Sequence, residues 1–140
     1  MKTKHTLTLT DTHTILRASE KHATNNSWAV CIAVVDDGGH LMGFSRLDGV
    51  GPASVDIAVA KAYSAAMRRR ATKLDEDLIA GGRIAALSMP GVTFLEGGVP
   101  ILVEGQVVGA VGVSGVKSSD DALIAMAGIA AVLAAANSES

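Results

Sequence analysis

The stretch from Glu96 to Gly115, EGGVPILVEGQVVGAVGVSG, constrains the fold more than any other part of the chain. Two apolar runs stand on either side of Glu104-Gly105, and this pattern predicts a tight β-hairpin. Glycines interrupt the second run, and Gly97-Gly98 with Pro100 precedes the first, so the backbone must pass close to a neighbour. A packed helix and a bound ligand are both neighbours that such glycines accommodate.

Turn and capping signals divide the rest of the chain into further elements. Asp36-Asp37-Gly38-Gly39 is typical of a hairpin turn, because Asp-Gly tolerates the positive φ angles that such turns need. Thr10 is expected to cap the first helix, and Thr72 with Asp75 resembles a capping box for a short third helix. The helices are expected at about residues 10–25, 52–70, after 72 and 118–136, and the strands at 28–35, 40–46, 92–95 and in the two hairpin arms.

The order of these elements predicts the fold class. Adjacent strands joined by tight turns imply an antiparallel sheet with helices packed against it, which is an α+β layer fold. A chain of 140 residues without a repeat or linker is expected to form a single domain, 1–140. The last helix is Ala-rich and apolar nearly all round, which is typical of burial in a core or at a subunit interface. The final residues, 137–140, are expected to be disordered.

Composition narrows the class of protein. Hydrophobic residues make up 49% and aromatic residues only 3%, so the core is built from Val, Ile, Leu and Ala. The net charge of −2 carries no basic surplus, which argues against nucleic acid as a partner. The N-terminus lacks the apolar region of a signal peptide, and no uninterrupted apolar segment reaches the ~18 residues of a membrane span. We therefore expect a soluble cytoplasmic protein with neither nucleic acid nor a membrane as partner.

Four motifs in combination carry a family resemblance. They are VVDDGGHLMGFSRLDG, the Pro-started helix with IAVAKAYSAA, the opening hairpin, and the helix with DDALIAMAG. Together they resemble the GlcG/HbpS-like family, which includes the C-terminal domain of PduO-type proteins, over a core of about residues 7–136. The resemblance implies a profilin-like sandwich whose central antiparallel sheet has about five strands, and it implies homo-oligomers. Haem binding, iron binding, sensory roles and a lyase activity on hydroxylaminobenzoate are associated with relatives.

Haem iron needs an axial ligand, usually His, Met, Cys or Tyr. His22 is the first candidate, because it falls on the inward face of the first helix; a surface or hydrogen-bonded core histidine is the structural alternative. His5 and His13 could form an exposed metal site, although they lack the i, i+4 spacing of helical ligand pairs. Cys31, in an apolar run, is expected to be a buried thiol and not a nucleophile.

Three charged residues are candidates for a site that binds an anionic ligand or substrate. Lys61 lies on a partly apolar helix edge, where it could attract an anionic ligand or, once desolvated, act as a base; the alternative is a lysine that extends along its helix to solvent. Arg46 can bind a carboxylate in bidentate geometry, which a lysine cannot. Asp48 follows it in the same loop and could pair with it or line a pocket.

Backbone and hydroxyl groups could complete such a site. The Gly97-Gly98 corner with Pro100 could present N–H groups to a carboxylate or haem propionate, or could be a turn that crosses a helix. Ser114 is a candidate polar pocket group. Gly109, Gly112 and Gly115 are expected to serve close packing between strand and helix.

Three functions remain open on these residues. The favoured hypothesis is a binding protein for a small anionic molecule, with haem first, because no catalytic constellation stands out. The second is a cofactor-independent lyase on a small carboxylated aromatic, in which Arg46 would hold the carboxylate while Lys61 or Asp48 moves protons. The third is an assembly or sensory protein without chemistry. A shared anion site requires the fold to bring the Gly97-Gly98 corner near Arg46 and Lys61.

Overall fold

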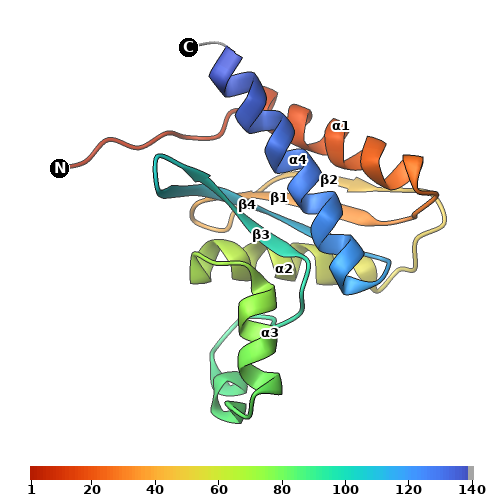
Figure 1. Ribbon diagram of the computed structural model, residues 1–140, viewed down its shortest axis with the longest axis vertical. Helices are drawn as coiled ribbons and strands as arrows, with labels where there is room; N and C mark the ends of the chain where they lie inside the picture. Colours follow the sequence, from red (N-terminus) through yellow and green to blue (C-terminus); the bar gives the residue numbers. More distant parts are fainter. Residues whose placement is uncertain (139–140) are drawn as a thin grey trace.

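The computed structural model describes residues 1–138 and consists of an antiparallel sheet between helices (Figure 1). The helices are α1 (Leu9–Asn25), α2 (Ser54–Arg68), α3 (Thr72–Ala80) and α4 (Ser118–Ser138), with a 3-10 turn η1 (Ile84–Ser88). The strands are β1 (Cys31–Asp36), β2 (Leu41–Arg46), β3 (Gly98–Val103) and β4 (Gln106–Ser114). They follow the order β2-β1-β4-β3 with every neighbouring pair antiparallel, which confirms the α+β fold. The sheet of the described residues has four strands, since residues 92–95, expected as a strand, form a loop.

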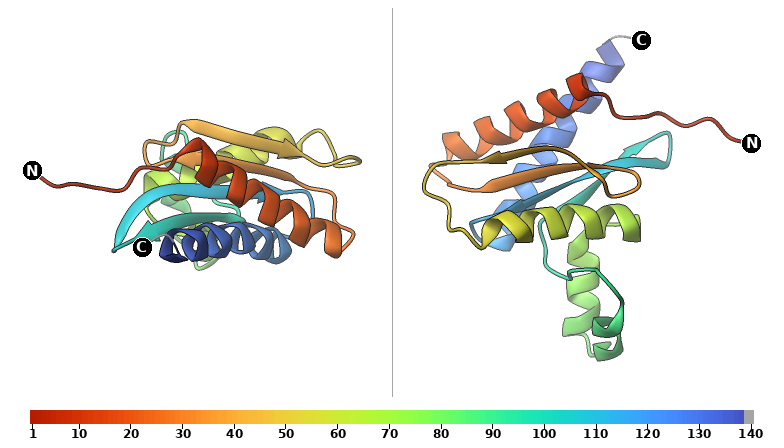
Figure 2. Two further views of the ribbon diagram at one scale, coloured as in Figure 1. Left: turned by 90° about the horizontal axis from the view of Figure 1, so that it is seen from above. Right: turned by 180° about the vertical axis from the view of Figure 1, so that it is seen from behind.

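The two faces of the sheet are covered by different helices (Figure 2). Helices α1 and α4 lie on one face and α2 on the other, so two apolar clusters form, one on each side. Strand β1 lies between both clusters and is buried from Cys31 to Val35, which explains why its sequence is apolar without alternation. Helix α3 and η1 project away from the sheet beyond α2 (Figure 1).

Two of the expected helix caps are wrong. Helix α1 is capped by Thr8 instead of Thr10: the Asp11 N–H donates to the Thr8 hydroxyl at 3.1 Å, and the Thr8 N–H donates to the Asp11 carboxylate at 2.8 Å. This reciprocal pair satisfies two N–H groups, which Thr10 cannot do without a partner three residues later.

The capping box expected at Thr72 does not form, because both of its members have partners elsewhere. The Thr72 hydroxyl accepts the Gly98 N–H at 2.9 Å and so ties the start of α3 to β3. Asp75 is 1% exposed, and its Oδ1 forms ion pairs with the Nη2 atoms of Arg68 at 3.0 Å and Arg70 at 3.1 Å. The α2–α3 corner is therefore held by a buried carboxylate between two arginines.

The opening hairpin is confirmed, with Glu104-Gly105 as its turn and β4 as a central strand. A Cβ atom on Gly112 would lie 2.2 Å from the Ala58 carbonyl oxygen and 2.3 Å from the Ala62 nitrogen. The backbone of α2 therefore rests directly on the backbone of β4, and the expected packing role of this glycine is confirmed.

The Gly97-Gly98 corner passes equally close to α2. A Cβ atom on Gly98 would lie 2.2 Å from the Lys61 carbonyl oxygen, and one on Gly97 would lie 2.8 Å from the Lys61 Nζ. Gly97 also has a φ of +132°, which side chains rarely adopt. The corner is therefore a place where the chain passes under a helix.

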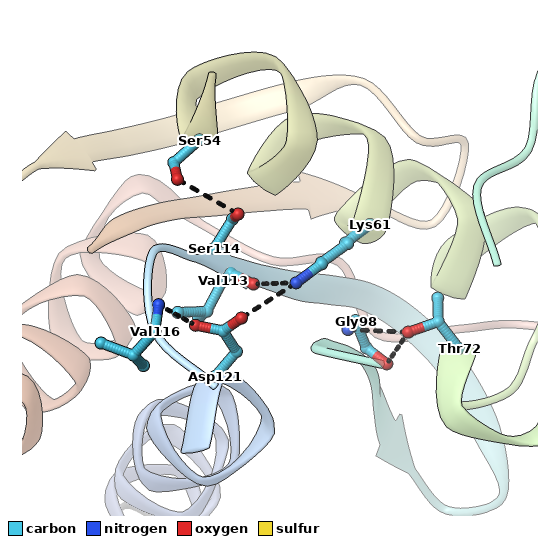
Figure 3. A network of polar contacts seen from close by, with 8 residues as sticks. All are labelled: Ser54, Lys61, Thr72, Gly98, Val113, Ser114, Val116 and Asp121. Atoms are coloured by element: carbon cyan, nitrogen blue, oxygen red, sulfur yellow. Dashed lines mark hydrogen bonds and ion pairs between the residues drawn. The ribbon is translucent and has the colours of Figure 1, made fainter. Parts of the chain in front are cut away.

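A buried ion pair joins α2, β4 and α4 (Figure 3). The ammonium group of Lys61, which is 2% exposed, donates to the Val113 carbonyl at 2.9 Å and to Asp121 Oδ2 at 3.0 Å. Asp121 Oδ1 accepts the Val116 N–H at 3.2 Å. Burial raises the pKa of the Asp121 carboxyl, and the charge and hydrogen bond of Lys61 act against that rise. We call this set the Lys61–Asp121 lock.

Helix α4 continues through Ser138, so the disorder expected for residues 137–140 is wrong for the first two, and residues 139–140 lie outside the described part. Its inner face is buried, and Gly128 lets α1 approach so closely that a Cβ atom would lie 2.3 Å from the Ser19 Oγ. By length and a mean hydropathy of 1.6, α4 alone among the described helices could cross a membrane, although core helices share these properties.

We predict that Gly112→Ala lowers the free energy of unfolding by about 1–3 kcal/mol, because the new methyl group overlaps the backbone of α2. Urea denaturation measures the change. Gly51→Ala is the matched control, since Gly51 is exposed and a Cβ atom there meets nothing within 4 Å. Equal destabilisation by the two substitutions would contradict the close contact between α2 and β4.

We predict that Lys61→Met lowers the free energy of unfolding by about 3–5 kcal/mol, because it leaves a buried carboxylate without its counter-charge. The double variant Lys61→Met/Asp121→Asn is expected to recover part of this loss, since Asn removes the charge and still accepts the Val116 N–H. Lys73→Met, which breaks the exposed pair of Lys73 with Asp77, serves as the control and should change stability little. A Lys61→Met protein as stable as this control would show that the lock does not hold the fold.

Candidate functional site

The residues expected to bind an anion lie on the α2 face of the sheet but do not meet. Arg46 and Ser114 both pair with Cys31, from opposite sides, so they lie two interstrand spacings apart, about 10 Å. Arg46 is exposed at the end of the edge strand β2. The Ser114 hydroxyl is nearly buried and donates to the Ser54 Oγ at 3.3 Å, at the start of α2 (Figure 3). Between them, burial raises the pKa of the Cys31 thiol, which disfavours a nucleophilic thiolate.

The condition for a shared anion site is met only in part. Lys61 adjoins the Gly97-Gly98 corner, but its ammonium group is held in the Lys61–Asp121 lock. Gly98 and Pro100 belong to β3, at the edge of the sheet opposite Arg46. Pro100 suits that edge, where it does not interrupt a central ladder.

The groups expected to move protons also lie apart. Asp48 is exposed in the loop after β2, while Lys61 is buried on the side of α2 that faces the sheet. Arg46 and Lys61 line none of the three cavities described below. The fold therefore does not gather Arg46, Asp48 and Lys61 around one substrate.

His22 lies half-buried in the last turn of α1, with its ring beside the indole of Trp28. The two ring centroids are 6.1 Å apart and the planes are tilted by 45°. Trp28, Leu47 and Asp48 line an open notch with a volume of about 340 Å³, together with Thr24, Ser27 and Ala29. His22 does not itself line this notch; its imidazole adjoins the notch through the indole of Trp28, the single tryptophan of the chain.

A larger hollow, the arm groove, was not expected from the sequence. It lies between the N-terminal arm (residues 1–7), the tip of the β3–β4 hairpin and the end of α4, and has a volume of about 480 Å³. Its floor is formed by Leu7, Ile101, Val108, Val132 and Leu133. The local signal was weak: Leu7 is one of two leucines in the polar segment KTKHTLTLT. Most of the other walls come from parts of the chain about a hundred residues away.

The rim of the arm groove carries His5, Asp11 and Glu104. The His5 Nε2 lies 3.6 Å from Glu104 Oε2, so the arm and the hairpin tip meet there. His13, the other histidine of the expected exposed metal site, does not line the groove. Within residues 1–138, no group of three His, Cys, Asp or Glu side chains is arranged to hold a metal ion.

A basic groove adjoins the arm groove across Leu102, which lines both. Its cations are Lys2, Lys4 and Arg69. Lys4 pairs with the Asp37 carboxylate, and that hydrogen bond holds the pKa of Asp37 below its ordinary value. Arg69 Nη1 donates to the Asp37 carbonyl at 2.8 Å. Two of the three cations are therefore engaged by one residue of the β1–β2 turn.

Comparison with known proteins assigns the family. The family described as haem degrading protein HbpS-like matches residues 7–130. Protein GlcG of Escherichia coli strain K12 is 48% identical over 114 residues, which cover 81% of this chain and 85% of GlcG. The crystal structure of Klebsiella pneumoniae protein ORFY superposes with a TM-score of 0.88 at 31% identity, covering 96% of this chain and 95% of that one.

A third relative is a complex with haem. The crystal structure of PduOC with haem superposes with a TM-score of 0.83 at 26% identity, covering 91% of this chain and 95% of that one. These three matches cover between 81% and 96% of this chain and between 85% and 95% of each relative. This chain therefore belongs to the HbpS-like family.

Proposed function

We propose that this protein binds haem, with His22 as the axial ligand of the iron. The observation that carries the proposal is the similarity to the PduOC–haem complex over 91% of the chain, in a family described by its action on haem. The bound haem would supply an iron centre whose properties depend on its axial ligand and on the polarity of its surroundings.

The surroundings of His22 fit such a ligand. Haem iron takes an axial ligand such as an imidazole, and the macrocycle takes apolar or aromatic surface. His22 offers the imidazole beside Trp28, and Trp28 lines the notch together with Leu47. Thr24 and Ser27 add hydroxyl groups that can donate to a propionate. The arm groove also has an imidazole, but its rim carries two carboxylates, Asp11 and Glu104, whereas the notch carries only Asp48, so the propionates would be repelled less at the notch. His22 is therefore the better of the two candidates.

We predict that haemin added to the purified apoprotein produces a saturable shift of the Soret band, and that His22→Ala removes the shift because the iron loses its protein ligand. Absorption titration measures both. His13→Ala is the matched control, since His13 is an exposed histidine of the same helix. His5→Ala tests the arm groove as the haem site.

Three outcomes would count against the proposal in different ways. A titration without shift or saturation would end the proposal that the protein binds haem. A normal shift in the His22→Ala protein would keep haem binding but exclude His22 as the axial ligand. A shift lost only in His5→Ala would move the haem to the arm groove.

We also propose that the protein assembles into a homo-oligomer. The segment that projects beyond α2 exposes four large apolar side chains: Leu74, Leu78, Ile84 and Leu87. The outer face of α4 adds Leu123 and Met126, at 46% and 45% exposure. Projecting apolar side chains held on a firmly tied segment are typical of a surface that another protein covers, and a second copy presents the same surfaces.

We predict that Ile84→Glu/Leu87→Glu converts the oligomer to a monomer of 14.2 kDa, because two charges would be buried in the contact. Light scattering after size-exclusion chromatography gives the mass. Leu9→Glu is the control, since Leu9 is 62% exposed at the start of α1, where a carboxylate is favourable. A wild-type protein that is monomeric at tens of micromolar would contradict the assembly.

A further inference from the structure

We propose that the arm groove is a second binding site, and that it takes a small amphipathic amine: an apolar ring system with one protonated amino group. This site is separate from the notch at His22. The notch lies where β1 begins and β4 ends, and the arm groove lies where β3 turns into β4.

The floor of the groove is an apolar surface on which the ring system of the ligand would be buried. Ile101, Val108 and Val132 are at most 5% exposed and belong to the core between the sheet and α4. Leu7 extends this surface from the arm, because its side chain is only 8% exposed although its neighbours in the arm are exposed. A volume of about 480 Å³ lies in the range of small-molecule sites. Burial of an apolar ring system on this floor is favourable in proportion to the area covered.

The charges at the rim decide the class of head group. The ionisable side chains that line the groove are two carboxylates, Asp11 and Glu104, and the imidazole of His5. The Thr8 N–H donates to the Asp11 carboxylate at 2.8 Å, so the helix cap holds this charge at the mouth of the groove. Glu104 lies on the hairpin turn on the other side. An ammonium group placed between the arm and the turn would be attracted to both carboxylates, in competition with His5 for Glu104, and a carboxylate ligand would be repelled.

The nearby cations do not reverse this preference. Lys2, Lys4 and Arg69 line the basic groove on the far side of Leu102. Lys4 and Arg69 are already directed to Asp37, by an ion pair and by a hydrogen bond to its carbonyl. The arm groove therefore has an apolar floor and an acidic rim, which complement an amphipathic cation and distinguish it from a site for haem or a carboxylated aromatic.

The test compares three probes that share one ring system and differ in charge: 2-naphthylmethylamine, 2-naphthylmethanol and 2-naphthylacetate. Each is titrated by calorimetry into the full-length protein at neutral pH and low ionic strength. We expect saturable binding of the amine, binding of the alcohol that is about two- to fivefold weaker, and still weaker binding of the acid, since solvent-exposed ion pairs contribute differences of this size. Added salt should reduce the preference for the amine.

Variants locate the binding. Ala136→Trp places a large side chain in the groove from the exposed end of α4 and should abolish binding of amine and alcohol alike. Ala134→Trp is the matched control, because Ala134 is exposed on the same helix and does not line the groove. Glu104→Gln should weaken the amine about two- to fivefold and leave the alcohol unchanged. Asp56→Asn, which removes an exposed carboxylate from α2, should change neither.

Three results would overturn the proposal: no saturable binding of amine or alcohol, binding that survives Ala136→Trp, or acid that binds as tightly as amine. The haem proposal stands or falls separately. Ala136→Trp should retain the Soret shift, and a protein that binds the amine without binding haem would refute the first proposal and support this one.

Discussion

The ion pair of Lys61 with Asp121 is the interaction on which the rest of the structure depends. A lysine that is removed from water needs a counter-charge and acceptors for its protons, and here α4 supplies the carboxylate while β4 supplies a carbonyl. The pair therefore fixes three elements that are far apart in sequence. It also limits its neighbours. Gly97 has a φ of +132°, and a Cβ atom there would lie 2.8 Å from both the ammonium nitrogen and the Val113 carbonyl oxygen. Gly112 lets the helix that carries Lys61 rest on β4.

Because the interior is occupied by these contacts, the hollows lie at the ends of the sheet. The notch beside His22 and Trp28 lies at the end where β4 finishes, and the arm groove lies at the end where β4 begins. The two hollows differ in chemistry: one is lined by an indole that lies beside the His22 imidazole, and the other has an apolar floor under two carboxylates. The two proposed sites therefore differ both in position and in the kind of ligand that their chemistry would favour.

Peripheral segments share one feature, which is that charged residues attach them to the core. Asp75 with Arg68 and Arg70 fixes the projecting α3 segment, and Lys4 with Asp37 fixes the N-terminal arm to a hairpin turn. The first contact holds in place the exposed apolar side chains of the proposed contact with a second copy, and the second holds one wall of the arm groove. In both cases a polar attachment presents an apolar surface, so the segments proposed to bind partners are ordered before binding.

The sequence by itself determined the features that rest on local chemistry. The Glu104-Gly105 turn, the Asp-Gly turn, the central position of VVGAVGVSG and the packing role of Gly112 could all be read from turn residues and apolar runs. The partners of polar side chains were decided only by the tertiary structure. Lys61 meets a carboxylate 60 residues away, Thr72 leaves its expected cap for Gly98, and the arm groove joins both ends of the chain to the hairpin tip. Local periodicity carries no information about such distant pairs, because they depend on which faces the packed elements bring together.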